Sequence, residues 1–123
     1  LAHYRQEMGW EPVQALFEDP ESEIDIAAPT LTEFARRLRA LGVEDAEIHN
    51  LLGNYSLLFT RVMAIDASIA IAAFAIGRQA PDRIPLIDTL IAAAAQADEA
   101  VLVHRDAHMA AIPAEAVRQH PLE

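Results

Sequence analysis

The chain has 123 residues and a formal net charge of −10, which suits one domain with a single core and argues against long-range attraction to bare nucleic acid or an anionic membrane. It contains no Cys, which excludes disulfides, thiol nucleophiles and cysteine-bound zinc and favours an intracellular, cytoplasmic protein. All nine basic residues are Arg, so chemistry that depends on a lysine is excluded. The longest apolar run, Ile69 to Ile76, is too short to span a bilayer.

The first half of the sequence predicts helices around one short strand. Apolar residues recur at helical spacing, and Gly42 ends one of these patterns. The segment before Pro29 alternates over the length of a short strand. The predicted elements are helices at Leu1–Met8, Glu11–Asp19, Pro29–Leu41 and Glu44–Leu58, and a strand at Ile24–Ala27.

The second half alternates between strands and helices. Asp66 is a predicted helix cap, and the helix after it is apolar on every face, which predicts cover on both sides. The other predicted elements are strands at Arg61–Ile65 and Ala100–Val103, a helix at Leu86–Ala97 and one helical turn at Ala107–Ala111. Val117–Leu122 is either a tail or an edge strand, and the sequence does not assign it. This order predicts the α/β class, with a central, mostly parallel sheet flanked by helices.

Three acids stand at the ends of these elements, and each has a structural explanation. Thr30 and Glu33 have the spacing of a capping box, in which Glu33 reaches back to the first amide of the helix. Asp88 lies in a first helical turn, where the helix dipole favours a carboxylate. Asp106 follows a strand and has the position of a cap for the next turn.

Taken together, the three acids point to a metal site. Glu33 follows one predicted strand and Asp106 another, and ligand crevices form at the carboxyl ends of parallel strands. Asp88 lies close to Glu33 and Asp106 if its helix starts at the edge of the sheet where the strands end. Carboxylates that converge repel one another unless a cation neutralises them, and hard oxygen ligands select Mg²⁺ or Mn²⁺. Such a site suits hydrolysis of a phosphodiester.

Three motifs carry a resemblance to a known family, namely Thr30–Phe34, Pro85–Ala93 and Val101–Asp106. In this order they resemble a PIN domain, specifically the VapC-type toxin of bacterial toxin–antitoxin pairs. The resemblance implies a single PIN-like domain over residues 1–123. It also implies a Mg²⁺- or Mn²⁺-dependent endoribonuclease in which Glu33, Asp88 and Asp106 bind the metal and carry catalysis. A cognate antitoxin protein and a homodimer are implied by the same resemblance.

The family has a further acid in an N-terminal strand, and Leu1–Tyr4 resembles the segment directly after that strand. The chain opens with Leu1 rather than Met, so we expect the missing strand and its acid to lie upstream. Two other interpretations stay open. One is a degenerate PIN scaffold that binds a partner protein without cleaving RNA. The other is a small α/β domain whose acids serve only as caps.

Other polar residues are weaker candidates. His104 and Arg105 precede Asp106 and have the position to contact a phosphate, although a His at a strand end is predicted to face solvent. Thr89 and His108 lie near the acids in sequence. A cluster of arginines at Arg36, Arg37 and Arg39 predicts a solvated helix face, with RNA or an acidic partner as the alternative.

Overall fold

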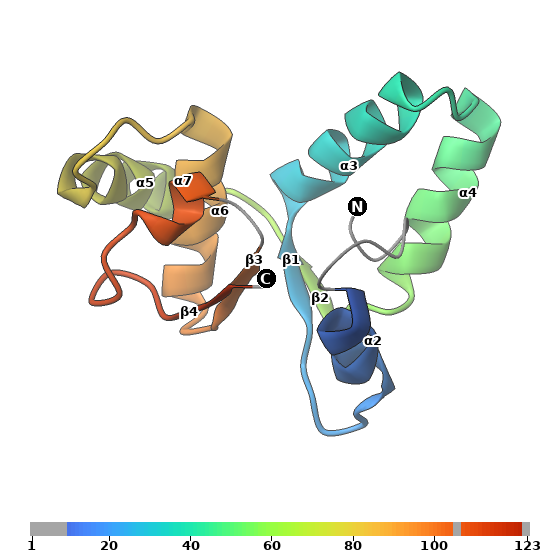
Figure 1. The fold of residues 1–123 in the computed structure, drawn as a ribbon, viewed down its shortest axis with the longest axis horizontal. Helices are drawn as coiled ribbons and strands as arrows, with labels where there is room; N and C mark the ends of the chain where they lie inside the picture. Colours follow the sequence, from blue (N-terminus) through green and yellow to red (C-terminus); the bar gives the residue numbers. More distant parts are fainter. Residues whose placement is uncertain (1–9, 105–106, 122–123) are drawn as a thin grey trace. The chain divides into compact units, whose positions relative to one another are not determined.

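The computed structural model describes residues 10–104 and 107–121, which form helices and short parallel strands (Figure 1). The chain divides into two compact units, Leu1–Ala64 and Ile65–Glu123. In the described part of each unit, two strands pair in parallel. The predicted α/β class and parallel strands are therefore confirmed, while the predicted helix at Leu1–Met8 lies outside the described residues.

The first unit is held together by one strand pair and by helix packing. It contains α2 (Trp10–Glu18), β1 (Asp25–Ala27), α3 (Ala28–Ala40), α4 (Asp45–Ser56) and β2 (Arg61–Met63). Asp25 lies opposite Arg61 in the ladder, and Arg61 Nη2 is 3.3 Å from Asp25 Oδ2. Helices α3 and α4 pack together and bury Leu38 and Ile48. The predicted helix Glu44–Leu58 extends beyond the observed end of α4 at Ser56, and Leu58 is exposed.

Aromatic side chains join α2, α3 and α4. The rings of Phe34 on α3 and Tyr55 on α4 meet edge to face with centroids 5.3 Å apart. Phe17 on α2 lies 6.4 Å from Tyr55 and 6.2 Å from Phe59. These separations are in the range favoured by the quadrupoles of aromatic rings. The cluster therefore fixes the part of α3 that carries Glu33, the residue before Phe34.

Helix α3 ends in a Schellman motif at Gly42. The Val43 N–H donates to the Leu38 carbonyl at 3.1 Å, and the Gly42 N–H donates to the Arg39 carbonyl at 2.9 Å. Gly42 has a φ of 91°, a left-handed conformation that favours glycine. The predicted end of this helix is therefore confirmed.

The second unit is built on two tightly packed helices. Its elements are α5 (Ala67–Gln79), α6 (Leu86–Ala97), β3 (Leu102–His104), α7 (Ala107–Ala110) and β4 (Gln119–Pro121). Ile69, Ala73 and Ile76 form the buried face of α5. Ile71 and Phe74 are 72% and 69% exposed, so the predicted cover on both sides of this helix is not met within the second unit.

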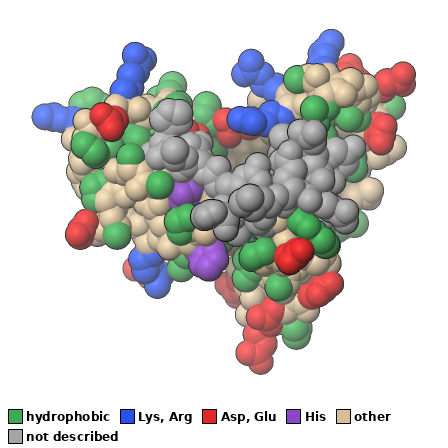
Figure 2. Space-filling model, in the orientation of Figure 1, with side chains coloured by type: hydrophobic (Ala, Val, Ile, Leu, Met, Phe, Trp, Pro, Cys, Tyr) green, Lys and Arg blue, Asp and Glu red, His purple; other side chains and the backbone are tan. Residues whose placement is uncertain are grey.

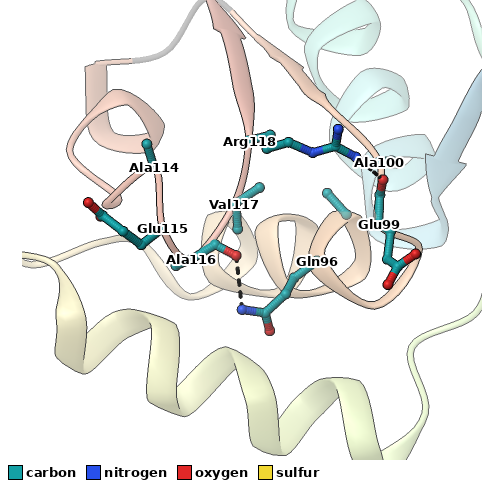
Figure 3. Close-up of a pocket in the computed structure, with 9 residues that line it drawn as sticks. Gln96, Glu99, Ala100, Ala114, Glu115, Ala116, Val117 and Arg118 are labelled. Carbon is teal, nitrogen blue, oxygen red and sulfur yellow. Dashed lines mark hydrogen bonds between the residues drawn. The ribbon is translucent and has the colours of Figure 1, made fainter.

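The segment Val117–Leu122, which the sequence does not assign, contains β4, and β4 pairs in parallel with β3. Two side-chain hydrogen bonds hold the preceding segment against the end of α6 (Figure 3). Gln96 Nε2 donates to the Ala116 carbonyl at 3.0 Å, and the Arg118 guanidinium donates to the Glu99 carbonyl. An open pocket of about 350 Å³ lies between these groups. The end of α6 therefore determines where β4 begins.

Charged side chains cover much of the surface. Arg36, Arg37 and Arg39 of α3 are exposed, which confirms the predicted solvated face. Figure 2 shows acidic side chains gathered on the first unit, where Figure 1 places the segment between α2 and β1. None of the helices in the described part of the chain has the length and hydropathy that crossing a bilayer requires.

Candidate functional site

Asp88 is a buried acid in the first turn of α6. It is the third residue of the helix and only 8% exposed. The helix dipole favours a carboxylate at such a position, by roughly 0.3–1 kcal/mol when the side chain is exposed. Burial instead removes the carboxylate from water, which is costly for a charged group. The dipole therefore explains why an acid is favoured at this position.

Thr89, next to Asp88, has a structural role. Its hydroxyl donates to the Leu86 carbonyl at 2.6 Å. Its methyl carbon lies 3.6 Å from the point where a Cβ on Gly77 of α5 would stand. Since Thr89 is buried against α5, it sets the rotation of the first turn of α6 and with it the direction in which Asp88 leaves the helix.

Glu33 is not part of a capping box, so this prediction is wrong. Helix α3 begins at Ala28, directly after β1, and its N-cap is Ala27, an extended residue with no side-chain cap hydrogen bond. Thr30 is therefore already inside the helix, and Glu33 is its sixth residue. A capping acid must stand three residues after the cap. The half-buried Glu33 is thus left without the structural explanation that its sequence suggested.

Asp106 and Arg105 lie outside the described residues, as does the side chain of His108. The elements on either side of Asp106 are described. Strand β3 ends at His104, and α7 begins at Ala107 and packs against α6. The helix that follows Asp106 in sequence is therefore in contact with the helix that carries Asp88.

The prediction that His104 faces solvent is wrong, because His104 is buried at 8% exposure. Its Nε2 lies 2.8 Å from Oε1 of Gln119, and Gln119 Nε2 donates to the Ile112 carbonyl at 2.8 Å. The signal that would have placed His104 is its strand period. It shares a face with Leu102, two residues earlier, and both are buried while Val103 between them is exposed. Gln119 carried no such signal, since it lies in the segment Val117–Leu122, which the sequence did not assign to a strand.

The three predicted acids belong to two units. Glu33 is in the first, and Asp88 is in the second together with Asp106, which lies outside the described range. Within the described part of either unit, no three His, Cys, Asp or Glu side chains form a group that would hold a metal ion. The chemistry of the predicted donor set nevertheless fits a hard cation, because all three donors are carboxylates and Asp88 is withdrawn from bulk water.

Comparison with protein families gives a direct match. The PIN domain model matches residues 1–115 of the chain. This range contains Glu33, Asp88 and Asp106. None of the curated proteins compared with the chain matches it. Because the match covers most of the sequence, the chain belongs to the PIN domain family, whose members are generally nucleases.

Proposed function

We propose that this chain is a metal-dependent endoribonuclease that hydrolyses RNA phosphodiester bonds. The observation that carries the proposal is the buried carboxylate of Asp88 in the first turn of α6, within a chain of the PIN family. A carboxylate at such a position is stabilised when it serves as a ligand to a cation. PIN nucleases typically use divalent metal ions, so Mg²⁺ or Mn²⁺ is the natural candidate.

Glu33, Asp88 and Asp106 are the proposed ligands and the proposed catalytic residues. Their role is to supply hard oxygen donors and to neutralise the charge of the cation. A divalent ion held by carboxylates lowers the pKa of a bound water and stabilises negative charge on the phosphate. The packing of Thr89 on α5 and of Phe34 on Tyr55 holds two of these acids on rigid helices.

The proposed biological setting is that of a VapC-type toxin in the cytoplasm, neutralised by a cognate antitoxin and acting as a homodimer. The charge of the chain supports a basic partner segment, because −10 at neutral pH attracts cationic peptides and repels RNA at long range. RNA contact then depends on a few arginines near the metal. Arg36, Arg37 and Arg39 are exposed and available for such contacts.

The test is substitution of Asp88 by Asn, which keeps the shape of the side chain and removes its charge. Wild-type protein should cleave RNA with Mg²⁺ or Mn²⁺ and lose activity in EDTA. Asp88→Asn should abolish cleavage while the midpoint of urea unfolding stays close to that of the wild type. Cleavage is measured on a mixed-sequence RNA, so that no particular cleavage site is assumed.

Asp82→Asn is the matched control. Asp82 is an exposed acid of the same unit, six residues before Asp88, and its substitution should leave cleavage unchanged. RNA cleavage by Asp88→Asn at the wild-type rate would refute the proposal. A wild-type protein that neither cleaves RNA nor binds a divalent ion would instead favour a scaffold that only binds a partner.

A further inference from the structure

We propose that His104 and Gln119 form a positioning pair that sets the end of β3, from which the chain leads into Asp106, and so controls how tightly the acids hold a divalent ion. This inference rests on the proposed function. It concerns two residues that neither the family match nor the acid motifs assign. The two side chains are 2.8 Å apart and connect the two strands of the second unit.

The hydrogen bonds of Gln119 have only one consistent direction. The Ile112 carbonyl can only accept, so the Gln119 amide must turn its NH₂ group toward it. The Gln119 amide oxygen is then left facing His104 and can only accept. The His104 ring must therefore donate from Nε2, which defines the ring orientation and places a proton on Nε2.

The pair links the two strands of a short ladder. The strands have three residues each, and Leu102 N–H donates to the Arg118 carbonyl at 2.8 Å where they begin. At the other end His104 stands opposite Pro121. The hydrogen bond between the side chains of His104 and Gln119 connects the two strands on the face of the ladder that also carries Leu102. It therefore ties the last residue of β3 to the first residue of β4, in a ladder of only three residue pairs.

The pair also connects the chain before Asp106 with the chain after it. His104 is two residues before Asp106, while Ile112 is six residues after it and is a buried residue of the turn that follows α7. The Ile112 N–H donates to the Met109 carbonyl at 3.0 Å, which ties this turn to α7. Gln119 thus bonds to a residue on each side of the segment that contains Asp106. Residues that orient metal ligands in this way strongly affect metal affinity.

The experiment compares Gln119→Met and His104→Phe with the wild-type chain. Each variant keeps the approximate size of the side chain and removes the hydrogen bonds. Mg²⁺ and Mn²⁺ binding is measured by calorimetry, and RNA cleavage is measured across a range of Mg²⁺ concentrations. Both variants should bind the ion roughly 10- to 100-fold more weakly, should recover cleavage at high Mg²⁺, and should keep the KM for RNA.

Two matched controls separate positioning from general disruption. Gln96→Met removes another glutamine-to-carbonyl hydrogen bond of the same unit, and His120→Phe changes the exposed histidine of β4. Neither should alter ion affinity. Loss of activity that high Mg²⁺ does not restore, with wild-type ion affinity in Gln119→Met, would overturn the inference.

A measurement on the wild-type chain covers the case in which the variants fail to fold. Nitrogen NMR should find His104 as the Nε2–H tautomer, and added Mg²⁺ should shift the side-chain amide signals of Gln119 but not those of Gln96. Unmoved Gln119 signals at saturating Mg²⁺ would overturn the inference. If Mg²⁺ binds equally to wild type and to Asp88→Asn, the proposed function itself fails and this inference with it.

Discussion

Asp66 and Ile69 close the first turn of α5, with Asp66 Oδ1 accepting the Ile69 N–H at 2.9 Å. Asp66 is extended, with φ −95° and ψ −179°, as an N-cap requires. This bond satisfies one of the amide groups that the start of a helix leaves without a partner. The cap predicted from the sequence is therefore confirmed, and it defines Ala67 as the first residue of α5.

Asp66→Ala should lower the free energy of unfolding by about 1 kcal/mol, because the Ile69 N–H loses its acceptor. Asp66→Asn is the control and should cost much less, since Asn caps about as well as Asp. Both are measured by urea unfolding followed by circular dichroism. Equal stability of Asp66→Ala and wild type would show that solvent replaces the cap without loss.

Glu33→Gln should reduce RNA cleavage by more than about 100-fold. This loss is larger than the one expected for a residue that only hydrogen-bonds to a metal ligand. Its stability should change by less than about 0.5 kcal/mol, because Glu33 makes no capping box in α3. Cleavage rate and urea midpoint are measured on the same preparation. Glu47→Gln, an exposed acid of α4, is the control and should change neither. A destabilised but fully active Glu33→Gln would return this residue to a structural role.

Gly42→Ala should destabilise the chain by roughly 1–2 kcal/mol, because an L side chain at a φ of 91° is strained. The site itself has open space around it, so the cost comes from the backbone alone. Gly53→Ala is the control, since Gly53 lies inside α4 with no atom near its absent Cβ. It should stabilise the chain by about 0.5–1 kcal/mol. Changes of the same sign in thermal unfolding would contradict this account.

Glu99→Gly should stabilise the chain by up to about 1 kcal/mol. Glu99 ends α6 in a Schellman motif, in which the Ala100 N–H donates to the Ala95 carbonyl at 2.9 Å, but its φ of 53° is left-handed. Glycine adopts this conformation without strain and keeps the carbonyl that Arg118 contacts. Glu115→Gly, on the same pocket, has no such strain to relieve and should not stabilise. A lower melting temperature for Glu99→Gly would show that its side chain contributes more than its backbone costs.

The features predicted correctly from the sequence depend on interactions within one helical turn. The cap at Asp66, the end of α3 at Gly42 and the first-turn position of Asp88 each arise from residue type and spacing. The α/β class arises from alternating periodicities, and the same motifs led to the family that the match over residues 1–115 confirms.

The features that needed tertiary structure depend on pairs of distant segments. The strands have three residues each, so whether β4 exists and which residue faces which is decided by a partner strand rather than by local preference. Helix α3 begins at Ala28, one residue before the predicted start at Pro29, because β1 leads directly into it. Thr30 therefore lies inside the helix and forms no capping box with Glu33. The burial of His104 depends on Gln119, 15 residues away in sequence. Local hydrogen bonds and backbone strain can be read along the chain, whereas burial and strand register arise only when separate segments pack together.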